Sequence, residues 1–261
     1  MQHHLELPKN PGATATQILE SLPDRLGAER SAAIIDHVKR GCIPDFLCHW
    51  REIQFTELGH NVSIFCLPDF LCLGTDQDWV FTPVGAITAE AVATLLNAHL
   101  PTPHLVDVIY QHSVKQVAKP WGPPYDQSMT YTSRWSVQTK KIANSSTFYA
   151  GSTNEGHLKN VCVSKRMEDK KGEWLSFYGW FKGNGKPIQG NNVDAHGAEY
   201  ADYAHGARFI FNEVLIDGQK MQFDDVLKHE TLYKLFEPTG CMKYGTYHAC
   251  RAAFGVTLVK Y

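Results

Sequence analysis

The sequence lacks several features that would place it in a specialised class of protein. No apolar run approaches the roughly 20 residues that a membrane-spanning helix needs. The net charge is only −2, so no strong electrostatic field would draw the chain to nucleic acid or to an anionic membrane. We therefore expect neither nucleic acid nor a membrane among its partners.

Cysteines are few, and a leader-like start is missing. Seven cysteines scattered over 261 residues do not require a disulfide framework. Residues 1–17 are polar and contain two prolines, which is not typical of a signal peptide. We expect a cytoplasmic protein with reduced thiols by default, and a secreted form that has lost its leader stays open. The sequence does not indicate an oligomeric state.

The residues that are present are those of an ordinary globular protein, with 43% hydrophobic and 20% charged residues. Helical periodicity predicts helices at 14–22, 28–41, 88–100 (with Thr88 as N-cap), 103–116 and 223–236. Alternation and β-branched or aromatic runs predict strands at 51–58, 61–67, 78–84, 160–166, 174–181, 186–189, 207–216 and, at the C-terminal end, 248–261.

The order of these elements predicts a single α+β domain over residues 1–261. Helices lie mainly in the first half, within 1–116, and a mostly antiparallel sheet forms in the second half, within 151–261. Residues 117–150 are polar, aromatic and without a sustained period, so we expect a long loop there. The sheet-forming half is expected to surround the functional site.

Two nearly identical heptapeptides, CIPDFLC at 42–48 and CLPDFLC at 66–72, raise the question of a metal site. Structural zinc sites favour two to four residues between paired cysteines, whereas five intervene here. Proline and aspartate favour a turn, and the following Phe-Leu pair favours burial. We predict two structural turns that lead into the core. Cys42, close to His49, remains an alternative nucleophile, because a nearby histidine can activate a thiol.

The densest group of polar side chains lies at 196–208 and comprises His196, Glu199, Tyr200, Asp202, Tyr203, His205 and Arg208. Two histidines and a carboxylate, His196, Asp202 and His205, are ligand types that suit a divalent metal such as zinc. Alternatively, His205 acts as a general acid or base beside Asp202, with Lys159 or Arg208 stabilising negative charge. The structural alternative is that these groups cap loops. Gly206 would let a substrate approach the backbone.

Two further segments supply candidate residues. His157 and Lys159 alternate before a predicted strand, so we expect both to face the same pocket as His205. Alternation in the strand at 174–181 places Tyr178 and Trp180 on one face, and Phe177 and Phe181 on the other. Such aromatic surfaces bind sugars or apolar groups, or belong to the core.

The segment KPIQ followed by H…EYADYAHGARFI resembles an uncharacterised, mainly bacterial family with a Pro-Ile-Gln stretch and a Tyr-x-Asp-Tyr-x-His-Gly-x-Arg motif. The likeness extends to GHLKNV and YGW, and more weakly to the Pro-Asp-Phe-Leu segments. Phe181 and Asn160 depart from the pattern. The family has no established activity, so the resemblance implies positions only: His157, Lys159, Tyr178, Trp180, Gln189, His196, Tyr200, Asp202, Tyr203, His205 and Arg208.

These patterns lead to one leading hypothesis and two alternatives. The leading hypothesis is a hydrolase of amide bonds in a peptide or cell-wall-like polymer. Its catalytic residues would be His205, Asp202, His157, Lys159 and Arg208, and its substrate-binding residues would be Tyr178, Trp180, Gln189, Tyr200 and Tyr203. The alternatives are a non-catalytic module that binds a glycan or small molecule, and an enzyme with Cys42 as nucleophile.

Overall fold

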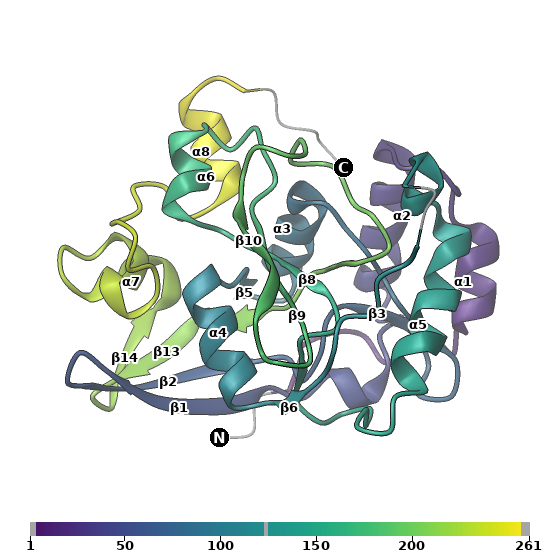
Figure 1. The fold of residues 1–261 in the computed structure, drawn as a ribbon, viewed down its shortest axis with the longest axis horizontal. Helices are drawn as coiled ribbons and strands as arrows, with labels where there is room; N and C mark the ends of the chain where they lie inside the picture. Colours follow the sequence, from purple (N-terminus) through teal and green to yellow (C-terminus); the bar gives the residue numbers. More distant parts are fainter. Residues whose placement is uncertain (1–3, 123–124, 257–261) are drawn as a thin grey trace.

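A computed structural model describes residues 4–122 and 125–256 and has a mixed α+β fold (Figure 1). The α-helices are α1 (Ala15–Ser21), α2 (Ala28–Lys39), α3 (Ala86–Leu95), α4 (Pro103–Gln111), α5 (Trp135–Ala143), α6 (Lys165–Asp169), α7 (Phe223–Lys228) and α8 (Tyr247–Ala253). Short 3-10 helices are η1 (Asp45–Leu47), η2 (Gln127–Thr130), η3 (Thr132–Arg134) and η4 (Leu232–Leu235).

Most strands are short. They are β1 (Arg51–Glu57), β2 (His60–Cys66), β3 (Cys72–Gly74), β4 (Trp79–Phe81), β5 (Ala98–His99), β6 (Val114–Lys115), β7 (Asn154–Glu155), β8 (Lys159–Val161), β9 (Phe177–Phe181), β10 (Pro187–Asn192), β11 (His205–Gly206), β12 (Ile210–Phe211), β13 (Glu213–Ile216) and β14 (Gln219–Gln222).

Within the described residues, the strands form two larger sheets and two small pairs. The first sheet has the order β14-β13-β2-β12-β5, with β1 also paired to β2, so it combines strands from both halves of the chain. The second has the order β10-β9-β8-β11. Its pairs are antiparallel except β8 and β11, which run parallel. The remaining pairs are β3 with β4 and β6 with β7.

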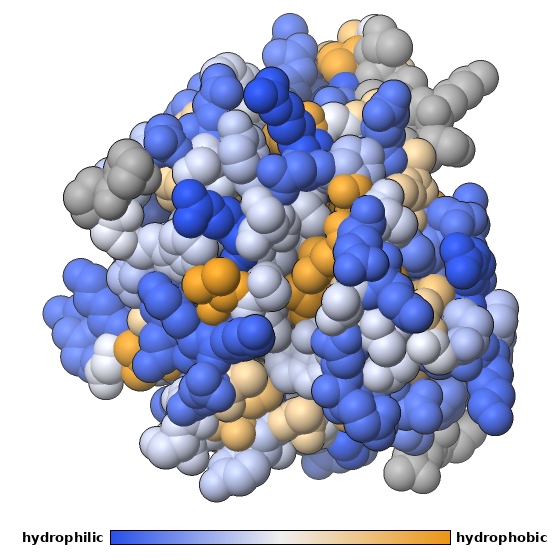
Figure 2. Space-filling view, turned by 90° about the vertical axis from the view of Figure 1, so that its right-hand side faces the viewer, coloured by the Kyte–Doolittle hydropathy of each residue, from blue (hydrophilic) through white to orange (hydrophobic). Residues whose placement is uncertain are grey.

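Helices surround these sheets on several sides. Figure 1 shows α1, α2 and α5 grouped at one end of the molecule and α6 with α8 at the top, with the second sheet between them. α5 packs on β4, α1 on β3, and α3 contacts both α2 and α8. The face on the α1–α2–α5 side is mostly hydrophilic, with apolar side chains in small separate patches (Figure 2). In the part of the chain that is described, no helix is long and apolar enough to cross a bilayer.

Several predicted elements are confirmed and others are corrected. The helices predicted at 14–22 and 28–41 form as α1 and α2. The helix predicted at 103–116 forms as α4 but ends at Gln111, before strand β6. Helices α1 and α4 carry threonine caps. Helix α3 begins earlier than predicted, after Gly85, so Thr88 is a buried helical residue and not its N-cap.

Two segments differ more strongly from expectation. The expected loop at 117–150 contains α5, which places Trp135 and Ile142, seven residues apart, in the core. The C-terminal apolar segment was expected to be a strand, but its first part is α8, because the Thr246 side chain accepts a hydrogen bond from the Ala249 N–H and caps a helix. Residues 257–261 lie outside the described part.

The cysteine heptapeptides have the structural character that their spacing predicted. All seven cysteines are free, and Cys42, Cys48, Cys66 and Cys72 are buried. Burial raises the pKa of Cys48 to about 12 and that of Cys66 to about 11, so these thiols are protonated at neutral pH. Burial also raises the pKa of Cys42, which is the opposite of what a nucleophilic thiol requires.

Candidate functional site

The candidate site forms where the two parallel strands β8 and β11 meet. His205 is the register partner of Lys159 in this pairing, and the Lys159 N–H donates to the Ala204 carbonyl at 2.7 Å. A turn at 202–205 is closed by the His205 N–H, which donates to the Asp202 carbonyl at 3.0 Å. The strand pairing therefore brings Lys159 beside His205, which is far away in sequence, and the turn brings Asp202 beside His205.

The carboxylate of Asp202 is the centre of this group. Its Oδ2 accepts a hydrogen bond from the Lys159 ammonium at 2.9 Å, and its Oδ1 accepts one from the Ala204 N–H at 2.8 Å. The Nδ1 atom of His205 lies 3.0 Å from Oδ1 and also 3.0 Å from the Asp202 backbone nitrogen. The predicted contact between His205 and Asp202 is present, and Lys159 completes it. We call these three residues the Lys159–Asp202–His205 centre.

Burial and the neighbouring polar groups together determine the charges in this centre. Burial alone would raise the pKa of Asp202, but His205 and Lys159 outweigh that effect and hold the pKa well below its usual range. Burial lowers the pKa of His205 from its ordinary value of 6.5, and the attraction of Asp202 does not fully compensate. At neutral pH the centre thus contains an ionised carboxylate paired with an ammonium, beside a neutral imidazole.

Two buried polar atoms in and near this centre have no hydrogen-bond partner among the described residues. Among the described residues, Nε2 of His205 and Nε1 of Trp180 are buried and have no hydrogen-bond partner. The Lys159 ammonium lies 5.2 Å from the centroid of the Trp180 ring and 5.7 Å from that of Phe177. Trp180 has a φ of 60°, in the left-handed region that side chains other than glycine rarely adopt. Strained backbone and unsatisfied buried groups concentrate at functional sites.

The three residues predicted to bind a metal do not form such a site. In residues 4–122 and 125–256, no group of three or more His, Cys, Asp or Glu side chains is placed to hold a metal ion. His196 stacks on Tyr200 with ring centroids 3.8 Å apart, and its centroid lies 6.4 Å from that of His205. Meanwhile both oxygens of Asp202 accept hydrogen bonds from within the chain.

The aromatic strand departs from the regular alternation that we predicted. Tyr178 packs with Phe181, whereas Trp180 packs with Tyr203, so Tyr178 and Trp180 do not share a face. The reason is the backbone: Gly179 has a φ of 95° and Trp180 one of 60°, which interrupts the pleat. The hydroxyl of Tyr178 donates to Asp107 on α4 at 3.0 Å, away from the Lys159–Asp202–His205 centre.

The other residues predicted to bind substrate have different positions. Tyr203 is buried, and its hydroxyl accepts a hydrogen bond from the Trp121 N–H at 2.8 Å. Tyr200 is half-buried and its ring lies 5.7 Å from that of His205, at a steep angle. Gln189 is half-buried on β10, where it pairs with Gly179. Of these three, Tyr200 contacts His205 directly.

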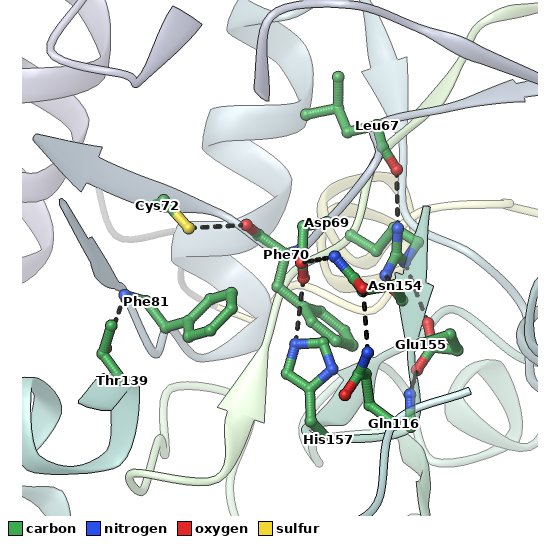
Figure 3. A network of polar contacts seen from close by, with 12 residues as sticks. Leu67, Asp69, Phe70, Cys72, Phe81, Gln116, Thr139, Asn154, Glu155 and His157 are labelled. Atoms are coloured by element: carbon green, nitrogen blue, oxygen red, sulfur yellow. Dashed lines mark hydrogen bonds and ion pairs between the residues drawn. The ribbon is translucent and has the colours of Figure 1, made fainter. Parts of the chain in front are cut away.

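His157 does not join His205 but belongs to a second buried network. Its Nε2 lies 3.1 Å from Oδ1 of Asp69, and its ring is surrounded by phenylalanines, including Phe70 and Phe81. Asn154 donates to the other oxygen of Asp69 at 3.0 Å. Figure 3 shows Asp69 reaching His157 and Asn154, with the Phe70 ring alongside. Lys159 thus contacts the same carboxylate as His205, whereas the prediction that His157 lies with them is wrong.

Arg208 lies in the same second network and is completely buried. Its guanidinium donates to Glu155 Oε2 at 3.0 Å, to the Leu67 carbonyl at 2.7 Å and to the Asn154 carbonyl. Each of the three nitrogen atoms donates within the fold, so Arg208 is not placed to stabilise charge on a substrate at His205. Sequence reasoning missed Asp69 and Glu155, whose partners lie 88 and 53 residues away along the chain.

The expected access of a substrate to this segment is corrected as well. Residues 201–208 are buried throughout. Gly206 does not open the backbone to a substrate, because a Cβ built there would lie 2.5 Å from Cδ1 of Phe70. The glycine instead allows the Phe70 ring to pack against β11.

Comparisons with protein-family models, curated proteins and solved structures found no match to this chain. The resemblance to a Tyr-x-Asp-Tyr-x-His-Gly-x-Arg family thus stays a prediction, and the chemistry of the site has to be argued from its own geometry.

Proposed function

We propose that the chain is a hydrolase of amide bonds in a peptide or cell-wall-like polymer, with His205 as general acid and base. The observation that carries the proposal is the Lys159–Asp202–His205 centre, in which Nε2 of His205 is left without a partner among the described residues. A neutral imidazole with one nitrogen held by a carboxylate has the arrangement that general base catalysis requires.

The position of His205 Nδ1 supports both halves of an acid–base cycle. When Nδ1 carries the proton of the neutral ring, it donates to Asp202 Oδ1, and Nε2 is free to take a proton from water. The ring is then an imidazolium, in which Nδ1–H still donates to Asp202 and the proton on Nε2 can be given to a leaving amine. Because Nδ1 keeps the same 3.0 Å contact with Asp202 in both forms, the ring does not have to move during the cycle.

A hydrolytic step follows from these roles. Water loses a proton to Nε2 of His205 and attacks the carbonyl carbon, forming a tetrahedral oxyanion. The ammonium of Lys159 offers the positive charge that stabilises the oxyanion. The C–N bond then breaks as the protonated Nε2 returns its proton to the departing nitrogen, which restores the neutral imidazole. Asp202 stays ionised throughout and orients the ring.

The test is a hydrolysis assay with peptide and cell-wall fragment substrates, read by mass spectrometry for new amino and carboxyl ends. We expect His205→Gln to lose roughly 10²–10⁴-fold in kcat/KM. The acid limb of the pH profile should lie below pH 6.5, since burial lowers the pKa of His205. His60→Gln is the matched control, because His60 pairs with Asp217 at the surface; it should keep full activity.

Melting temperatures distinguish this proposal from a purely structural role for the buried centre. The proposal expects Lys159→Met and His205→Gln to lose turnover at temperatures where each variant is still folded. Failure of the wild-type protein to cleave any of these substrates would refute the assignment to amide hydrolysis. A folded His205→Gln protein with unchanged turnover would remove His205 from the reaction.

A further inference from the structure

The Lys159–Asp202–His205 centre is closed to solvent, so a molecule that reacts there needs a way in. His205 is 0% exposed, and its Nε2 atom is buried. Asp202 is 2% exposed and Lys159 is 6% exposed. No substrate can reach Nε2 unless a neighbouring group moves, and the surroundings of the centre show which group that is.

The side of the centre that faces the Lys159 ammonium is held by hydrogen bonds. The ring of Trp180 lies 5.2 Å from this ammonium and packs in a buried cluster with Tyr203. The Tyr203 hydroxyl accepts a hydrogen bond from the Trp121 N–H at 2.8 Å. The Trp121 indole in turn donates to the Gln138 side chain at 2.5 Å. Opening this side would break these hydrogen bonds and expose the buried Trp180 ring.

The opposite side consists of aromatic rings around His205. The His205 ring contacts those of Phe177, Tyr200 and His196, with centroid distances of 5.3, 5.7 and 6.4 Å. Phe177 is 3% exposed and does not lead to solvent, whereas His196 and Tyr200 are half-buried. These two rings stack with centroids 3.8 Å apart and planes 12° from parallel. The His196–Tyr200 stack therefore connects His205 with the surface.

The backbone that carries the His196–Tyr200 stack is anchored to neighbouring segments. The His196 carbonyl accepts from the Leu175 N–H at 2.9 Å, and the Ala198 carbonyl accepts from the Ala86 N–H at 2.7 Å. In the part of the chain that is described, by contrast, neither the His196 imidazole nor the Tyr200 hydroxyl makes a hydrogen bond. Turning these side chains to other rotamers opens the centre without breaking backbone pairing, and partly exposed side chains change rotamer rapidly.

We propose that the His196–Tyr200 stack is the entrance to the Lys159–Asp202–His205 centre, and that a small molecule reaches His205 when these two rings turn outward. In hydrolysis, the scissile amide would lie where the two rings now contact His205. This part in catalysis rests on the proposed hydrolase function, but the opening itself does not. Replacing Tyr200 by a smaller residue should leave the entrance open.

Diethyl pyrocarbonate tests the entrance without a hydrolysis assay, because it acylates a neutral imidazole that it can reach. Burial lowers the pKa of His205, so this ring is neutral at pH 7. Peptide mass spectrometry would follow the labelling rate of His205 and, as an internal reference, that of His157, which is 1% exposed in the second buried network. Tyr200→Ala should raise the His205 rate roughly 2- to 10-fold, the effect of losing one aromatic stack, and leave the His157 rate unchanged.

Two control variants preserve or move the opening. Tyr200→Phe keeps the stacked ring, so both histidines should react as they do in the wild type. Tyr203→Phe loosens the opposite side by removing the hydroxyl that binds the Trp121 N–H, and the His205 rate should not change. A faster His205 in Tyr203→Phe but not in Tyr200→Ala would place the entrance at Trp180 and overturn the proposal.

A second opening variant, His196→Ala, covers the case in which Tyr200→Ala loosens the whole fold. Equal acceleration of His205 and His157 in both variants would show general loosening and no local entrance, which contradicts the proposal. The hydrolase function is judged separately. Faster His205 labelling in Tyr200→Ala, in a protein that cleaves no amide, would keep the entrance and remove the hydrolase. Amide cleavage with unchanged labelling in Tyr200→Ala would keep the hydrolase and remove this entrance.

Discussion

The sharpest test of the packing around the candidate site is Gly206→Ala. An added Cβ would lie 2.5 Å from Cδ1 and 2.8 Å from Cγ of Phe70, and 3.1 Å from Cδ1 of Leu158. The Phe70 ring has little room to retreat, because it is buried between His157, at 5.1 Å, and the Arg208 guanidinium, at 4.7 Å. Overpacking of this kind costs about 1–3 kcal/mol in the free energy of unfolding.

The assay is urea unfolding combined with calorimetry. For a chain of this length, each kcal/mol should lower Tm by roughly 2–4 °C. Gly190→Ala is the matched control, since nothing lies within 4 Å of a Cβ built there; its stability should be unchanged or slightly higher. Adding Phe70→Leu to Gly206→Ala should cost less than the sum of the single changes. If Gly206→Ala proves as stable as the wild type, the packing argument is wrong.

Three further predictions concern buried and exposed groups. Arg208→Ala should lower the free energy of unfolding by about 3–5 kcal/mol, because it leaves Glu155 buried without its cation. Arg166→Ala, which breaks an exposed ion pair, should lower it by only about 0–1 kcal/mol. Chemical denaturation measures both values. In the native protein, a thiol reagent should modify Cys241 first, since the other six cysteines are buried; rapid labelling of several thiols would contradict this burial. The free energy of unfolding should fall as the pH drops from 6.5 towards 4, because His99 takes up a proton in the unfolded chain at a higher pH than in the folded protein. In urea melts at several pH values, His99→Gln should show a weaker dependence of this free energy on pH. An unchanged pH dependence would show that His99 is not responsible.

The parts of the fold that the sequence predicted correctly are those with local causes. Helix α1 carries its own capping box at Thr14, and α4 has Thr102 as its cap and Pro103 at its start. The beginning of α3 was misplaced, because Gly85 supplies no side-chain cap and its position is set by tertiary packing against the backbone of Glu199. Such a contact between distant segments leaves no periodic pattern in the sequence.

In the candidate site, too, contacts between residues close in sequence were predicted and contacts between distant residues were missed. The contact of Asp202 with His205 was predictable, since three residues separate them and a turn suffices to bring them together. The assignment of His157 to that site failed, because its partner, Asp69, is 88 residues away and looked like an ordinary turn residue. Alternation along β9 failed at Trp180, where a positive φ breaks the two-residue period.

The buried contacts of the Arg208 guanidinium affect how the chain folds during its synthesis. It joins the carbonyl groups of Leu67 and Asn154 to the carboxylate of Glu155, over separations of 141, 54 and 53 residues. On a ribosome, the first two partners emerge long before the arginine does, and contacts of such long range form slowly. Until Arg208 arrives, enclosing Glu155 would bury an uncompensated charge, so the nascent chain must keep its centre hydrated and open. Fragments that end before residue 208 should therefore depend on chaperones and fail to reach a native core.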